Sequence, residues 1–228
     1  MNRYFSLIFF GYLLNGCAPS TITKQDFAPK MYKELPRSIL VLPPINKSTA
    51  ADAKEYYLST VAPPLTNSGY YVFPIEFVSD VLKQEGLSDT ETMMNIPPQK
   101  FREFFGADAV MYISILKWNT NYLLVAGSVT VQIECELKSS ISGESLWYYN
   151  EEMEVNTTGE QNKQGGLAGV LLQAVETAVK TAATDYVPIA RNVNTKIFLT
   201  LPYGKYRPEH NADGNQIIQQ KSRVIKKY

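Results

Sequence analysis

The chain has few of the residues on which enzymes and metal sites most often depend. Its 228 residues include one histidine, His210, and two cysteines, Cys17 and Cys135. A Ser-His-Asp triad or a histidine metal cluster therefore lacks its usual parts. The sequence has no Gly-x-Ser-x-Gly elbow and no Gly-x-x-x-x-Gly-Lys phosphate loop. These absences predict a protein that is not an enzyme and that holds neither a metal nor a cofactor.

Charge of either sign is not in excess. The 22 basic and 22 acidic side chains leave no net charge, so the chain lacks the basic field with which proteins bind nucleic acid. What the sequence does have is aromatic content, with 15 tyrosines and 10 phenylalanines. Aromatic residues favour strands and half-buried surfaces, so we expect a folded domain.

The N-terminus has the layout of a lipoprotein signal. An apolar run over residues 4–14 follows Arg3, and Gly16 precedes Cys17. At about 1.5 Å per residue, such a run makes a helix that covers only about half of a bilayer's hydrocarbon core. A small residue before a cysteine looks like the bacterial lipobox, so we expect cleavage between Gly16 and Cys17 and lipidation of Cys17. The alternative is an ordinary signal peptide with Cys17 as an incidental cysteine.

Composition divides the chain into four parts. Residues 1–16 are the predicted signal peptide, and residues 17–36, with three prolines among Ser, Thr and Lys, are a predicted lipidated tether. Residues 37–207 are expected to form one α/β domain. Residues 208–228 form a polar, basic tail, for which two interpretations stay open: a solvated terminus, or a basic contact with a membrane surface or a partner.

Apolar patterns predict the strands of the domain. Short strands are expected at 38–42 and 70–73, and residues 109–115 are apolar on both faces except at Ser114, as in a central strand. Every second residue from 123 to 137 is apolar, and 146–155 returns after a Ser-Gly-Glu turn. This pattern predicts an antiparallel meander within a single mixed sheet.

Helices are expected between and after these strands. The first is predicted to kink or restart at Pro63 and Pro64, because proline removes a helical hydrogen bond. Gly86 and Gly106 follow two of the others as left-handed caps. The four predicted helices are near residues 58–65, 77–82, 97–105 and 167–186.

Carboxylates are the remaining candidates for catalysis. Two pairs share exposed faces of predicted strands: Glu134 with Glu136, and Glu152 with Glu154. Exposed acids make poor general acids, so an envelope hydrolase is the least favoured function. Asp108 is expected to bond the backbone at a helix-to-strand turn. Cys135 lies on the apolar face of its strand and is predicted to be a buried, inert thiol.

Five segments taken together resemble a known family. They are PRSILVLPPIN (36–46), GYYVFP (69–74), FREFFGADAVMYISI (101–115), the Ser-Gly-Glu turn with Leu146-Trp147, and LPYG (201–204) with Tyr206 and Pro208. They are similar to a family of bacterial outer-membrane lipoproteins of unknown function, known through a genome-derived vaccine antigen. The resemblance implies an α/β domain related to the periplasmic domain of the curli secretion lipoprotein CsgG and to the N-terminal domain of TolB. It carries over one functional residue, the lipidated Cys17.

The resemblance also implies partners. Family members tend to be encoded beside a CsgG-like lipoprotein and another small lipoprotein, and Ala18 after Cys17 implies the outer membrane. We therefore expect a non-enzymatic accessory or scaffold, lipid-anchored at the periplasmic face, in an envelope secretion or transport assembly. Tyr203 and Tyr206 are candidate partner contacts, although a strand packed on the domain explains them equally well. The alternative function is an auxiliary lipoprotein of an ABC-type transporter that binds a lipid or another apolar ligand. A homo-oligomer is left open.

Overall fold

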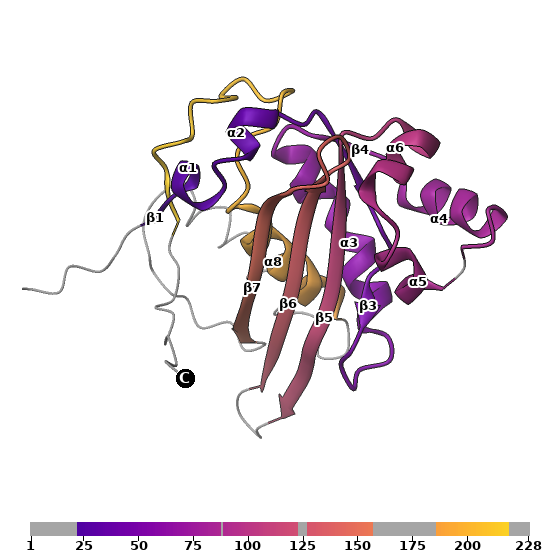
Figure 1. Ribbon diagram of the computed structural model, residues 1–228. Coiled ribbons are helices and arrows are strands. Elements are labelled where there is room, and N and C mark those ends of the chain that lie inside the picture. The colour runs from indigo at the N-terminus through magenta and orange to yellow at the C-terminus, as the bar shows by residue number, and fades with distance from the viewer. Residues whose placement is uncertain (1–21, 88, 123–126, 157–185, 219–228) are drawn as a thin grey trace, which may run out of the picture.

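A mixed sheet of six strands forms the centre of the molecule. The computed structural model describes residues 22–87, 89–122, 127–156 and 186–218, which are coloured in Figure 1. The strand order is β4 (Tyr71–Val72), β2 (Ser38–Val41), β5 (Ala109–Tyr122), β6 (Gly127–Ser139), β7 (Ser145–Asn156), and β3 (Ile45–Asn46) pairs further along β5. Helices cover both faces of the sheet, which confirms the predicted α/β class. No helix of the described residues is both long and apolar enough to cross a membrane.

Parallel and antiparallel pairing divide the sheet into two halves. In one half, β2 (Ser38–Val41) pairs in parallel with β4 (Tyr71–Val72) on one side and with β5 (Ala109–Tyr122) on the other. In the other half, β5, β6 (Gly127–Ser139) and β7 (Ser145–Asn156) pair antiparallel in chain order. The predicted strands at 38–42, 70–73 and 109–115 correspond to β2, β4 and the first part of β5.

The alternation predicted for β6 is confirmed over the described residues. Its core-facing side chains are fully buried and the residues between them are half-buried. Residues 123–126, which the same pattern includes, lie outside the described residues. A bulge shifts the register of β5 between Ile115 and Lys117, so that Trp118 stands opposite Val131 and stays buried. The extra residue therefore keeps apolar side chains on the core face.

Two apolar cores lie on opposite faces of the sheet. The larger one contains buried residues of α3 (Ala53–Asn67) and α8 (Val187–Phe198). The smaller one contains residues of α4 (Ile75–Gln84), α5 (Thr90–Met94) and α6 (Pro98–Phe105). Figure 1 shows α4 to α6 at one end of the molecule, and β1 (Ile22–Thr23) and α1 (Lys24–Phe27) at the other.

The expected helices at 77–82 and 97–105 are present as α4 and α6. Helix α6 ends at Gly106, whose φ of +71° provides the predicted left-handed cap. The expected restart of α3 is wrong, because that helix is continuous through Pro63 and Pro64. Pro63 is exposed, while Val61 and Leu65 on either side of the two prolines pack in the larger core. The predicted helix at 167–186 falls almost entirely outside the described residues.

The segments predicted as tether and tail are folded wherever they are described. Residues 22–34 form β1 (Ile22–Thr23), α1 (Lys24–Phe27) and α2 (Met31–Glu34), and β1 pairs antiparallel with β8 (Ile217–Ile218) near the other end of the chain. Ala28 and Met31, on either side of Pro29, belong to the larger core. An open tether is therefore wrong for residues 22–36. Residues 208–218 are largely exposed, but Asp213 and β8 hold them to the N-terminal segment. Helices of four residues and strands of two are too short to produce a visible period.

Candidate functional site

The residues that the sequence singled out are distributed over separate parts of the molecule. Gly16 and Cys17 lie outside the described residues. Tyr203 and Tyr206 lie in the loop after α8, where Tyr203 is half-buried and Tyr206 is 67% exposed. Of these two, Tyr203 is part of a polar cluster that joins the two ends of the described chain.

A buried ion pair is the centre of this cluster. Lys24 Nζ lies 3.2 Å from Asp213 Oδ2, and the two side chains are 5% and 0% exposed. Tyr32 donates its hydroxyl to Asp213 Oδ1 at 3.1 Å, and the Tyr203 backbone N–H donates to Oδ2 at 2.8 Å. Burying a carboxylate costs free energy unless donors surround it, and three donors do so here.

The ring of Tyr203 brings a second cation into the cluster. Lys24 Nζ lies 4.1 Å and the Arg207 guanidinium carbon 3.8 Å from the centroid of this ring, both within the range of cation–π attraction. Arg207 also donates to the carbonyl oxygen of Asn67 at 3.0 Å. We call Lys24, Tyr32, Tyr203, Arg207 and Asp213 the terminal junction.

Burial governs the titration of the terminal junction. Desolvation lowers the pKa of Lys24; the charge and hydrogen bond of Asp213 oppose this effect, and Arg207 adds to it. Desolvation raises the pKa of Tyr32, and the charge of Asp213 raises it further. With Asp213 fully buried and Lys24 nearly so, the ion pair does not face a substrate. The arrangement suits a structural joint between the chain ends.

Backbone contacts hold the same loop against the end of α3. The Gly204 N–H donates to Ser68 O at 2.8 Å, the Tyr206 N–H donates to Gly69 O at 3.0 Å, and the Tyr70 hydroxyl donates to Pro202 O at 2.7 Å. A Cβ on Gly204 would overlap the carbonyl oxygen of Gly69, so only glycine permits this approach. The loop is therefore fixed to the domain as well as to the N-terminal segment.

Asp108 has the structural role that its position predicts. Its carboxylate accepts from the Arg37 backbone N–H at 3.0 Å and from Arg102 Nη1 at 3.3 Å, and its own N–H donates to Ser38 Oγ at 3.0 Å. It lines an open hollow of about 400 Å³ together with Glu34, Arg37 and Lys205, among others. Its lining mixes these charged side chains with Leu35, Pro36 and Ile141.

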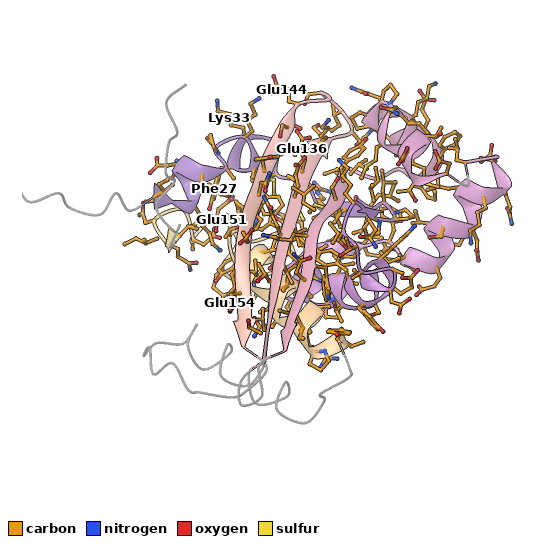
Figure 2. All side chains as sticks on the ribbon, turned by 90° about the horizontal axis from the view of Figure 1, so that it is seen from below. Phe27, Lys33, Glu136, Glu144, Glu151 and Glu154 are labelled. Atoms are coloured by element: carbon orange, nitrogen blue, oxygen red, sulfur yellow. The ribbon has the colours of Figure 1, made fainter. Side chains whose placement is uncertain are left out.

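The remaining candidates for catalysis lie in the core or in surface ion pairs. Cys135 is fully buried, as predicted, and burial raises the pKa of its thiol to about 12. Glu136 Oε2 lies 3.3 Å from Lys138 Nζ, and Glu152 Oε2 lies 2.8 Å from Lys117 Nζ. Side chains of opposite charge are often paired in this way on the exposed face of a sheet. Figure 2 shows Glu136 and Glu154 toward opposite ends of the sheet. Within the described ranges no three His, Cys, Asp or Glu side chains gather as a metal site would require.

Sequence reasoning did not identify the terminal junction. Lys24 and Asp213 are 189 residues apart in the chain, and each stands alone in a polar segment without a period. The one available signal was Tyr203, singled out as an aromatic residue in a recognisable LPYG stretch.

Comparisons with known proteins agree on one family. A family model described as "Putative lipoprotein GNA1162-like" matches residues 26–202. A protein of Neisseria meningitidis serogroup B named "Putative lipoprotein NMB1124/NMB1162" is 35% identical over 161 residues, which cover 70% of this chain and 74% of that protein. Four of the five junction residues lie outside the matched range, so the match to the family model does not extend to them.

One solved structure gives the same result. The crystal structure of lipoprotein GNA1162 from Neisseria meningitidis aligns with a TM-score of 0.52 at 33% identity, and covers 63% of this chain and 98% of that chain. A PelC dodecamer from Paraburkholderia phytofirmans aligns with a TM-score of 0.43 at 13% identity, and covers 74% and 89% of the two chains. The second likeness is too low to carry an inference about function.

Proposed function

The chain belongs to the GNA1162-like lipoprotein family, and on this basis we propose that it is an outer-membrane lipoprotein whose domain works, without catalysis, as an accessory or scaffold in an envelope secretion or transport assembly. Residues 1–16 are the signal peptide in this proposal, Cys17 carries the lipid, and Ala18 directs the protein to the periplasmic face of the outer membrane. The proposed partner is a CsgG-like lipoprotein, because the family resemblance implies that members are encoded beside one. The relationship of this domain to the CsgG periplasmic domain and to the TolB N-terminal domain is part of the same proposal.

The terminal junction is the observation that supports this function best. The N-terminal segment is folded into the domain from Ile22, and Lys24 is held by Asp213. A protein attached only for localisation gains nothing from such a joint, because a loose linker serves equally well. A scaffold must present its surfaces in a fixed orientation, and a joint beside the anchor provides that.

Anchoring is tested by Cys17→Ser in the full chain expressed in its own envelope. We expect this variant to move from the membrane fraction to the soluble periplasmic fraction, because the thiol is the lipid acceptor. Its unfolding curve should match that of the delipidated wild type, since Cys17 precedes the described core of the domain. A variant that stays firmly in the membrane fraction would overturn the proposed anchor.

The scaffold role is tested by cross-linking the native protein in intact envelopes, followed by purification in detergent and mass spectrometry. We expect recovery of a CsgG-like lipoprotein in stoichiometric amount. Tyr206→Ala should reduce that recovery, because Tyr206 is the more exposed of the two candidate contacts. Tyr148→Ala is the matched control, since Tyr148 is also exposed but lies on β7. Recovery of this chain alone would contradict the role.

A further inference from the structure

The proposed lipid anchor and the first described residue, Ile22, are close together in the chain. Four residues, 18–21, separate Cys17 from Ile22. An extended chain spans at most about 3.6 Å per residue, so Ile22 stays within about 18 Å of a lipidated Cys17. A domain of this size is roughly 40 Å across. The far side of the domain therefore cannot turn toward the bilayer surface.

Ile22 is also fixed to the domain. It pairs with Ile218 in the β1–β8 ladder, and the Lys24 N–H donates to Gln216 O at 2.9 Å. The buried Lys24–Asp213 pair then holds the first turn that follows. The segment cannot separate from the domain without exposing these groups, so the anchor acts on the whole domain at this point.

The β1–β8 end carries an exposed apolar side chain. Ile217 is the register partner of Thr23 and is 60% exposed. Ile217 therefore offers this end an apolar contact with a lipid surface.

A group of exposed aromatic residues lies at the other end of the molecule. Tyr71, Phe77 and Phe104 belong to β4, α4 and α6, and Figure 1 shows these elements across the sheet from β1 and α1. The short link between Cys17 and Ile22 keeps this end away from the bilayer. It therefore supplies a control position of similar apolar character.

We propose that the β1–β8 end of the domain rests on the lipid surface, with Ile217 as its apolar contact. This inference depends on the lipidation of Cys17 proposed above. It fixes which face of the domain meets the membrane, and it leaves the end with α4 to α6 directed toward the periplasm.

Fluorescence quenching tests the proposed orientation. The full-length lipidated protein, with Ile217→Cys or Phe77→Cys labelled by a fluorophore, is placed in vesicles of phosphatidylethanolamine and phosphatidylglycerol. The native Cys135 is fully buried and stays unlabelled. We expect a nitroxide carried on the lipid to quench the label at position 217 several-fold more than the label at position 77. Equal quenching at the two positions would overturn the proposal.

Two further measurements identify the cause of either result. Flotation with the vesicles reports lipidation by itself: a protein that fails to float contradicts the anchor, whereas one that floats with equal quenching contradicts only the orientation. An insertion of about 20 Gly and Ser residues after residue 20 increases the distance that the link can span between Cys17 and Ile22 by roughly 25 Å. The inserted variant should still float, and its quenching at position 217 should fall to the level at position 77. An undiminished difference would contradict the short link as the cause.

Discussion

The long strands β5 to β7 and the terminal junction are held together by opposite means. In the strands, many apolar side chains from consecutive elements alternate into one core. In the terminal junction, a single carboxylate binds a lysine, a tyrosine hydroxyl and a backbone N–H from three separate segments. Stability is thus distributed in the sheet and concentrated on Asp213 in the junction, and single substitutions should distinguish the two.

The largest effect is expected from Asp213→Ala. This change leaves the Lys24 ammonium buried without its counter-charge and should lower the free energy of unfolding by about 3 to 5 kcal/mol. Glu152→Ala is the matched control, because it also removes a carboxylate paired with a lysine, but at the exposed surface of β7. It should cost less than about 1 kcal/mol. Urea denaturation measures both, and equal costs would remove the distinction between the regions.

The second effect concerns the sheet. Ile133→Ala should cost about 2 to 4 kcal/mol, because it leaves a cavity beside the fully buried centre of β6. Gln132→Ala, one residue earlier on the other face, should be nearly neutral, since its amide bonds only to the exposed Asn150. The same urea titrations apply. A costly Gln132→Ala would show that the polar face of the sheet is packed against another part of the chain.

A smaller effect is expected at the ring of Tyr203. Tyr203→Leu removes the π-face that lies beside Lys24 and Arg207 and should cost about 1 to 2 kcal/mol. Tyr203→Phe keeps the ring and should cost much less. Thermal unfolding of both variants separates the two effects. Equal losses of stability in the two variants would show that the Tyr203 hydroxyl, rather than the ring, stabilises the junction.

The fourth effect depends on pH. The pKa of Cys135 is about 12 in the folded protein against an ordinary value near 9. Below pH 9 the thiol is protonated in both states, whereas above pH 9 only the unfolded chain releases its proton. The stability therefore falls as pH rises from 9 to 12, by about 1 kcal/mol per pH unit from this group. Cys135→Ser keeps a hydroxyl near Tyr57 and should show a shallower decline between pH 9 and 11; identical slopes would contradict the assignment.

Sequence patterns predicted the sheet well because its information is local. The alternation through Ile133 and Cys135, the doubly apolar run at the start of β5 and the glycine cap at Gly106 each follow from neighbours in the chain. Residues 22–36 were predicted as a tether because prolines and polar residues without a period normally indicate one.

The terminal junction could not be predicted in the same way. The contact of Lys24 with Asp213 depends on the folded domain bringing two chain segments together, and one lysine and one aspartate leave no pattern in a sequence. The same holds for the loop at Gly204, whose need for glycine arises from the nearby carbonyl of Gly69. The sequence shows that residue 204 is a glycine, but not which backbone atom it approaches.

Native-state hydrogen exchange tests the fixed junction most directly. The amides of Lys24 and Tyr203 donate to Gln216 O at 2.9 Å and to the Asp213 carboxylate at 2.8 Å. If the N-terminal segment is part of the folded domain, both amides should exchange as slowly as that of Ile133 in β6, through global unfolding. Exchange at the rate of an unstructured peptide would show that the segment is a loose tether and would contradict the joint between the chain ends.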